Sequence, residues 1–119
     1  MMKTVLVVED TEDLREAYMA IISREGYRVI GAANGQHALD ILEAGGDTPC
    51  LIVLDWMMPV MDGQTFLTAL RKTRFASLPI VIVSAYAADD AGHQVKTVVQ
   101  KPISYTTLTH LVREYCGDE

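Results

Sequence analysis

Three uninterrupted runs of apolar, mostly β-branched residues dominate this sequence, at residues 5–8, 51–54 and 80–83. Each run is apolar at every position, so a strand formed there would be buried on both faces. Strands of this kind are typical of parallel sheets that are covered by helices on both sides. Two weaker runs, at residues 28–30 and 97–99, fit shorter strands. The sequence therefore predicts a five-stranded parallel sheet.

The segments between these runs have helical periodicity. Four groups of apolar residues recur at the spacing of one helical face: Leu14, Tyr18, Ile21 and Ile22; Ala38, Leu39 and Leu42; Phe66, Leu67 and Leu70; and Leu108, Leu111, Val112 and Tyr115. Asn34 can cap the second helix and Asp62 with Gly63 can begin the third, while Gly26 provides a stop for the first. The alternation predicts an α/β, flavodoxin-like doubly wound fold with right-handed crossovers and helices on both faces.

Length and composition limit the classes of protein that the chain can belong to. The 119 residues contain no repeat or linker, so we expect one domain over residues 1–119. The net charge of −6 argues against a nucleic-acid-binding face. No apolar run reaches the roughly 18 residues of a membrane span, and the beginning of the chain lacks a signal-peptide layout. We therefore expect a cytoplasmic protein with no nucleic-acid or membrane partner.

Cysteines and histidines give no sign of a metal site. Cys50 and Cys116 are far apart and lack ligand spacing, so we expect two reduced thiols. The histidines share no ligand spacing and are all expected at the surface: His37, His93 and His110.

Polar residues follow four of the five predicted strands. They are Glu9 and Asp10, Asp55, Ser84 and Lys101. Because ligands in doubly wound sheets bind outside the carboxyl ends of the strands, we expect these groups to converge. Three carboxylates at close quarters repel one another unless a divalent cation neutralises them. An all-oxygen site suits Mg²⁺ or Mn²⁺, and the ammonium and hydroxyl groups can hold a phosphoryl group.

In this arrangement the chain resembles the response-regulator receiver family of two-component signalling. An acidic pair follows the first strand, and residues 54–63 are similar throughout to the family's phosphorylation loop. Ser84 with Ala85 and Lys101 with Pro102 match the family's hydroxyl and lysine positions. The resemblance covers nearly the whole chain, with its motifs in the family's order.

The resemblance implies a Mg²⁺ site, and no organic cofactor. Asp10 and Asp55 would ligate the ion directly, whereas Glu9 would act mainly through water. The backbone carbonyl of Met57 would supply a further ligand, which leaves the side chain at that position free to vary.

The resemblance also implies a phosphoryl-transfer role. Asp55 would accept the phosphoryl group from a phosphohistidine on a kinase or a phosphotransfer protein, and would lose it slowly by hydrolysis. Lys101 would contact the phosphoryl oxygens and precede a cis bond to Pro102, and Ser84 would close onto the group after transfer. The output would pass through contacts with a downstream protein, so the chain would be a switch rather than an enzyme. Neither the donor nor this partner has a signature in the sequence.

Two features depart from the family pattern. The segment between Ser84 and Lys101 is short, which predicts a fourth helix that is short or missing. Val98 stands where the family often has the aromatic switch residue, three positions before the lysine, while Tyr86 lies elsewhere. The usual coupling between hydroxyl and aromatic residue is therefore in doubt, whereas phosphorylation is not.

Three other classes of protein share part of this pattern. Haloacid-dehalogenase-like phosphatases carry a second aspartate two positions after the nucleophile, where this chain has Met57. Flavodoxins bind a flavin phosphate after the first strand, where residues 9–13 here are mostly acidic. A pseudo-receiver that only binds partners is disfavoured by Asp55 and Lys101, although Val98 and the short segment keep it open.

Overall fold

The computed structural model describes residues 2–85 and 95–117. The strands are β1 (Thr4–Val8), β2 (Arg28–Ala32), β3 (Leu51–Asp55), β4 (Ile80–Ser84) and β5 (Val95–Gln100). The helices of the described residues are α1 (Glu12–Arg24), α2 (Gly35–Glu43), α3 (Gly63–Leu70) and α4 (Tyr105–Cys116). All strand pairs are parallel, in the order β2-β1-β3-β4-β5. The predicted doubly wound five-stranded sheet is confirmed.

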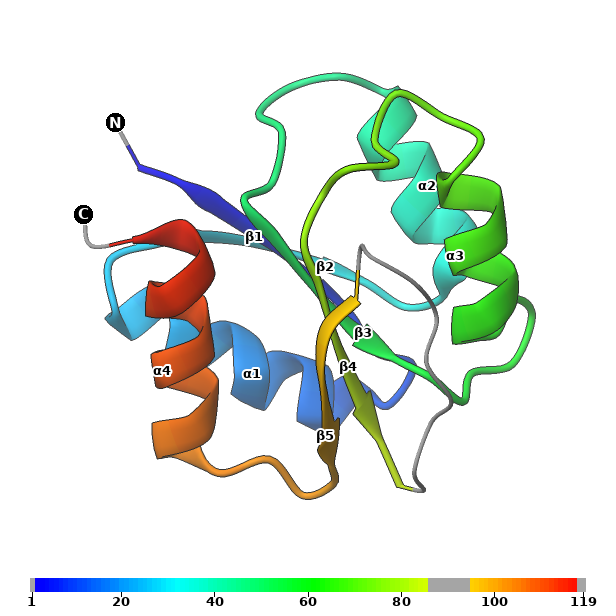
Figure 1. Cartoon of the computed structure of the whole chain (residues 1–119). Helices are drawn as coiled ribbons and strands as arrows, with labels where there is room; N and C mark the ends of the chain where they lie inside the picture. The colour runs from blue at the N-terminus through cyan, green and yellow to red at the C-terminus, as the bar shows by residue number, and fades with distance from the viewer. Residues whose placement is uncertain (1, 86–94, 118–119) are drawn as a thin grey trace.

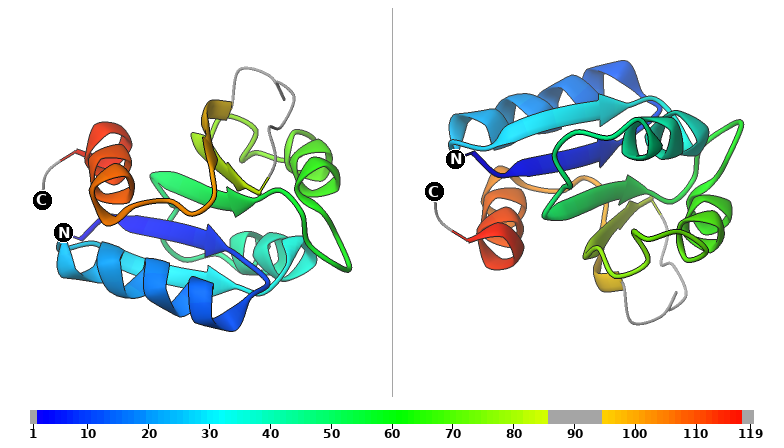
Figure 2. Two further views of the ribbon diagram at one scale, coloured as in Figure 1. Left: turned by 90° about the horizontal axis from the view of Figure 1, so that it is seen from below. Right: turned by 90° about the horizontal axis from the view of Figure 1, so that it is seen from above.

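Two helical layers cover the sheet. Helices α1 and α4 lie on one face, and α2 and α3 lie on the other (Figures 1 and 2). Each face has its own apolar cluster, one including Tyr18, Ile22 and Val112 and the other including Leu39 and Phe66. Strands β1, β3 and β4 are buried at every position, as their continuous apolar composition predicts.

The helix boundaries have local causes. The Asn34 side chain accepts a hydrogen bond of 2.8 Å from the His37 backbone N–H, and so caps α2. Asp62 Oδ1 accepts one of 2.8 Å from the Thr65 N–H at the start of α3. Gly26, just after α1, has a φ of 93°, which only glycine adopts without strain. The caps and the stop predicted from the sequence are confirmed.

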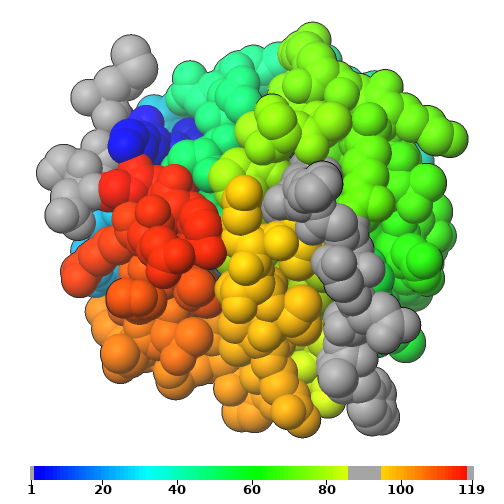
Figure 3. Space-filling view, in the orientation of Figure 1, coloured from blue at the N-terminus to red at the C-terminus, as the bar shows by residue number. Residues whose placement is uncertain are grey.

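The edge strand β5 pairs with β4 alone and lies at the surface beside α4 (Figure 3). Its side chains alternate between partly buried and exposed, and the register with β4 is irregular between Ile80 and Val81. Val98 pairs with Ile82 and is 38% exposed. Residues 86–94, which include Tyr86 and His93, lie outside the described residues. The prediction of a short or missing helix between β4 and β5 falls on this segment and stays a prediction.

The expectation of two reduced cysteines is wrong. Cys50 and Cys116 form a disulfide whose Cα atoms are 5.3 Å apart. Cys50 directly precedes β3 and Cys116 is the last residue of α4, so the packing of α4 brings together two residues separated by 66 positions.

Two of the three histidines lie in the part of the chain that the structure describes. His37 and His110 are exposed, as predicted. Among the residues that the structure describes, no helix has both the length and the apolar character needed to cross a membrane.

Candidate functional site

Three carboxylates meet at the carboxyl ends of β1 and β3. Glu9 and Asp10 follow β1, Asp55 ends β3, and one carboxylate oxygen from each lies within 4.8 Å of the others. Glu9 and Asp55 are only 1% and 3% exposed, whereas Asp10 is partly exposed. A buried carboxylate is costly without a partner, so this arrangement requires compensating positive charge.

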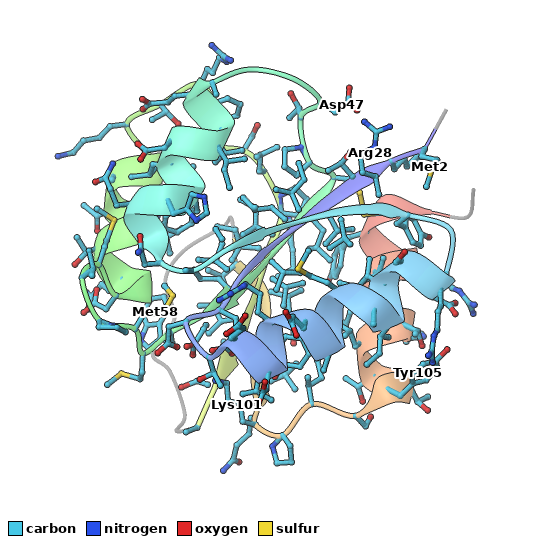
Figure 4. The ribbon with its side chains drawn as sticks, turned by 180° about the vertical axis from the view of Figure 1, so that it is seen from behind. Met2, Arg28, Asp47, Met58, Lys101 and Tyr105 are labelled. Carbon is cyan, nitrogen blue, oxygen red and sulfur yellow. A yellow bond between two sulfur atoms is a disulfide. The ribbon has the colours of Figure 1, made fainter. Side chains whose placement is uncertain are left out.

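Lys101 supplies part of that charge. Its Nζ lies 2.9 Å from Glu9 Oε1 and 3.3 Å from Asp55 Oδ1. The backbone N–H of Lys101 donates a 2.7 Å hydrogen bond to the carbonyl of Ser84, which holds the end of β5 against β4. The peptide bond to Pro102 is cis, as the resemblance implied. Figure 4 shows Lys101 reaching the end of the sheet where this cluster lies.

The turn after β1 fixes the position of Glu9. Its backbone N–H donates to the carbonyl of Ala32 at 3.0 Å. Its Oε2 accepts from the Thr11 N–H at 3.1 Å, and its carbonyl accepts from Arg15 Nη1 at 2.9 Å. Thr11 and Arg15 are not among the site residues predicted from the sequence. Arg15 could have been found from the sequence as a basic residue in the first turn of the helix that follows the acidic pair.

The loop between β3 and α3 is compact around Asp55. The Trp56 N–H donates to the carbonyl of Val83 at 3.2 Å, and the Gly63 N–H donates to the carbonyl of Trp56 at 2.8 Å. A Cβ at Gly63 would lie 2.6 Å from Trp56 Cε3 and 2.9 Å from its Cα. Glycine is therefore required there, which gives this residue a packing role as well as its place at the start of α3.

Ser84 and Met57 take different positions around the cluster. Ser84 is the last residue of β4 and is 1% exposed. It follows Val83, which pairs with Asp55 of the neighbouring strand β3. Met57 is 61% exposed, and its N–H lies 3.4 Å from Asp55 Oδ1. The backbone thus places both residues at the predicted edge of the sheet, with the Met57 side chain directed to solvent.

Burial and crowding change the acidity of the cluster. Burial, the neighbouring Asp10 carboxyl and the charge of Glu9 together raise the pKa of Asp55 to about 7. Burial acts in the same sense on Asp10, but hydrogen bonding with Asp55 and Glu9 outweighs it and lowers the pKa of Asp10. Burial alone would lower the pKa of Lys101, yet its contacts with Glu9 and Asp55 raise it. Asp10 and Asp55 therefore share one proton below about pH 7, beside a charged lysine.

The donor set fits a hard divalent cation. All the side-chain ligands are carboxylate oxygens, which Mg²⁺ and similar ions prefer. Asp55 Oδ2 is buried and has no hydrogen-bond partner among the described residues. A buried carboxylate oxygen normally has a partner, so this oxygen is available as a ligand to a cation.

A doubly wound α/β domain with an acidic cluster and a lysine at its switch-point edge belongs to the class of domains that bind charged ligands at the carboxyl ends of their strands. Within that class the family is shown by comparison. A profile described as the response regulator receiver domain matches residues 5–113. The chain belongs to this family.

Individual relatives agree with this assignment. The chain is 36% identical over 116 residues to the sensor kinase CckA of Brucella abortus (strain 2308), covering 93% of this chain and 12% of that protein. It is 30% identical over 119 residues to the sporulation initiation phosphotransferase F of Bacillus subtilis (strain 168), covering 100% and 88% respectively. The chain thus spans a small part of the first relative and most of the second.

A solved structure has the same fold. The response regulator TrrA of Thermotoga maritima, in complex with Mg²⁺ and BeF, has a TM-score of 0.83 to this chain. The two are 28% identical, and the match covers 96% of this chain and 99% of that one.

Proposed function

We propose that residues 1–119 form one receiver domain in which Asp55 accepts a phosphoryl group in a reaction that depends on a divalent cation. One observation carries this proposal. Asp55 is a buried carboxylate with one oxygen that lacks a hydrogen-bond partner among the described residues, and it lies close to two further carboxylates and to the ammonium of Lys101. This combination is unfavourable for stability alone and suits the binding of a metal ion and a phosphoryl group.

The side chains divide the chemistry among them. A carboxylate oxygen of Asp55 attacks phosphorus, an O–P bond forms, and the bond from phosphorus to the donor nitrogen breaks. The donor imidazole keeps the electron pair of that bond. The Lys101 ammonium offsets negative charge on the phosphoryl oxygens, because it already lies 3.3 Å from Asp55 Oδ1. The Ser84 hydroxyl, at the end of the neighbouring strand, donates a hydrogen bond to the transferred group.

Asp10 and Asp55 would hold Mg²⁺, or Mn²⁺ in its place, with Glu9 acting through water and the Met57 carbonyl as a further ligand. The bound ion would supply positive charge for the carboxylates and for the phosphoryl oxygens. Support for this assignment comes from the all-oxygen donor set of the cluster. The related TrrA protein of Thermotoga maritima, solved in complex with Mg²⁺ and BeF, supports it too.

The proposed donor is a phosphohistidine on a histidine kinase or a phosphotransfer protein. Similarity to a sensor kinase and to a sporulation phosphotransferase supports this class of donor. We assign this reaction to the cytoplasm. The domain then signals through protein contacts, without a nucleic-acid or membrane partner, and its own chemistry is limited to accepting the phosphoryl group and hydrolysing it slowly.

Mass spectrometry after incubation with acetyl phosphate and Mg²⁺ tests the proposal. We expect the wild-type chain to gain one phosphoryl group, and the Asp55→Asn variant to gain none. Asp62→Asn is the matched control, because Asp62 is an exposed carboxylate in the same loop and asparagine also caps a helix. Labelling of Asp55→Asn equal to wild type, or full labelling in excess chelator, would overturn the proposal.

A further inference from the structure

The C-terminal end of α4 is attached to the rest of the molecule by a disulfide, by two hydrogen bonds to backbone carbonyls and by the ion pair of Arg113 with Glu25. Cys116 forms the disulfide to Cys50, and its carbonyl accepts a hydrogen bond from Lys3 Nζ. The carbonyl of Gly117 accepts one from the Tyr27 hydroxyl. Both polar acceptors are backbone groups of the residues at and just after the disulfide. The crosslink therefore positions the groups that the two hydrogen bonds use.

This attachment lies far from the acidic cluster. Cys50 comes before β3, whereas Asp55 ends it, so the disulfide and the cluster are at opposite ends of the central strands. Figure 4 shows the same separation, with Lys101 at one end of the sheet and Met2 and Asp47 at the other. In Figure 3 the beginning of β1 meets the end of α4 at the surface. A change at the disulfide can thus alter α4 without touching the phosphoryl site.

One cysteine of the disulfide lines a surface pocket. Cys116 is 2% exposed, but Cys50 is partly exposed and lines a surface pocket of about 440 Å³. The residues that line this pocket come from the beginning of β1 and the segment before β3: Met2, Lys3, Thr4, Asp47, Thr48 and Cys50. A small reductant can therefore approach Cys50 Sγ while Cys116 Sγ stays inside the protein.

The reduced form has a stable arrangement available. Cys50 Sγ lies 3.2 Å from the carbonyl oxygen of Thr4, so a Cys50 thiol can donate a hydrogen bond to that oxygen. Buried apolar residues elsewhere on α4, including Leu108 and Val112, pack against the sheet independently of the disulfide. Opening the bond is thus compatible with a folded domain in which most of α4 keeps its position.

We propose that the Cys50–Cys116 disulfide is a redox-sensitive switch that controls the order of the last turn of α4. In the reductive step, a thiolate of a dithiol reductant attacks Cys50 Sγ and Cys116 leaves as a thiolate, which then takes a proton. The second thiol of the reductant resolves the mixed disulfide. The dithiol loses two electrons and becomes a disulfide, and the protein gains two thiols. Because cytoplasmic conditions keep most thiols reduced, a disulfide there responds to oxidation.

The switch is independent of the proposed phosphoryl chemistry. In the oxidised form the last turn of α4 is fixed to the start of β3. In the reduced form it is held by the two hydrogen bonds, by the ion pair of Arg113 with Glu25 and by side-chain packing. The end of α4, together with the neighbouring Lys3 and Tyr27, therefore presents a surface that differs between the two redox states.

Amide hydrogen exchange with and without dithiothreitol tests the proposal under native conditions, with thiol alkylation and mass spectrometry to count free thiols. After treatment with diamide as oxidant, we expect no alkylated cysteine, and then two once dithiothreitol is added. Reduction should speed exchange over residues 113–117 by on the order of tenfold, while Leu6 to Val8 in the central strand β1 stay protected. Labelling by acetyl phosphate should be equal in the two forms.

Cys50→Ser is the matched variant, because serine is close in size to cysteine and position 50 is partly exposed. It should show fast exchange at residues 113–117 in both buffers. The proposal is overturned if diamide leaves both thiols free, or if dithiothreitol opens the bond only in denaturant. It is also overturned if exchange over residues 113–117 is the same in both redox states of the wild-type protein.

Discussion

Lys101 Nζ lies 2.9 Å from Glu9 Oε1, closer than its 3.3 Å to the proposed phosphoacceptor, Asp55. In the absence of a cation, the lysine is therefore shared between the acidic pair after β1 and the end of β3. Binding of a cation would neutralise the carboxylates and would leave the ammonium available to a phosphoryl group. The contact with Glu9 thus holds Lys101 near the position in which the proposed chemistry needs it.

The Lys101→Ala variant is expected to keep its fold and lose much of its phosphotransfer. The fold persists because Asp55 can take up a proton in place of the lost ion pair. A charge-assisted hydrogen bond of about 1.5–3 kcal/mol would be missing from the transition state, which corresponds to a rate lower by about 10- to 100-fold. Stopped-flow quenching of Trp56 fluorescence by acetyl phosphate measures that rate. Lys96→Ala, which removes an exposed lysine of β5, is the control and should react at the wild-type rate.

The acidity of Asp55 predicts a pH-dependent stability. Its pKa is about 7 in the folded protein against 3.8 ordinarily, so between these values the folded state holds a proton that the unfolded state releases. The free energy of unfolding of the metal-free protein should therefore fall as pH rises from about 4 to about 7. The Asp55→Asn variant lacks this titrating carboxyl group, so the free energy of unfolding of the variant should fall less over the same pH range.

Urea unfolding in excess chelator at pH 5 and pH 8 measures the effect in both proteins. The wild type should lose more stability than Asp55→Asn between these two pH values. Addition of Mg²⁺ should raise wild-type stability more at pH 8, where the Asp55 carboxylate is ionised, than at pH 5. Parallel pH profiles of the two proteins would show that Asp55 titrates normally.

The strands and the site positions could be predicted because their physical signals are local. Continuous apolar runs require burial on both faces, and residues 5–8, 51–54 and 80–83 all lie in central strands. The edge strands β2 and β5 are longer than predicted, because edge positions are partly exposed and tolerate polar or small residues such as Gly31 and Lys96. The acidic residues and the lysine were recognised because the strand ends of a parallel sheet share one edge.

The other features of the fold and of the site could not be predicted, because they depend on contacts that no local sequence pattern encodes. The Cys50–Cys116 disulfide requires the end of α4 to lie over the start of β3, which follows only from the packed structure. Thr11 supports Glu9 through its backbone N–H, so its residue type carried no information. The Arg15 side chain binds the backbone carbonyl of Glu9, an acceptor that every residue has, so no pattern marked this pairing in advance. A left-handed backbone conformation is usually predicted where the sequence has glycine or asparagine, and Val60 is neither.

Loss of the disulfide is predicted to destabilise the domain only under oxidising conditions. The bond closes a loop between positions 66 apart, and restricting the unfolded chain in this way is worth about 2–4 kcal/mol. Urea unfolding of Cys50→Ser should give a lower free energy of unfolding than oxidised wild type by about this amount. In dithiothreitol the free energies of unfolding of the two proteins should agree closely. A difference that persists in dithiothreitol would point to lost packing at position 50 instead.

A strained residue lies in the loop next to the site. Val60 has a φ of 68°, in the left-handed region that β-branched residues rarely adopt, and the Met61 N–H donates a 2.7 Å hydrogen bond to the carbonyl of Pro59 across it. Val60 is 84% exposed, so its side chain contributes little packing to offset the strain. Backbone strain of this kind costs about 1–2 kcal/mol.

Val60→Asn is therefore predicted to stabilise the protein. Asparagine tolerates the left-handed conformation, and unlike glycine it adds little freedom to the unfolded chain. The gain should be about 1 kcal/mol, which raises the melting temperature of a domain of this size by about 4 °C in differential scanning calorimetry. Val60→Ile is the control, because isoleucine keeps the β-branch and the strain and should melt with the wild type. Equal melting temperatures for Val60→Asn and Val60→Ile would mean that the conformation of this loop costs the folded protein nothing measurable.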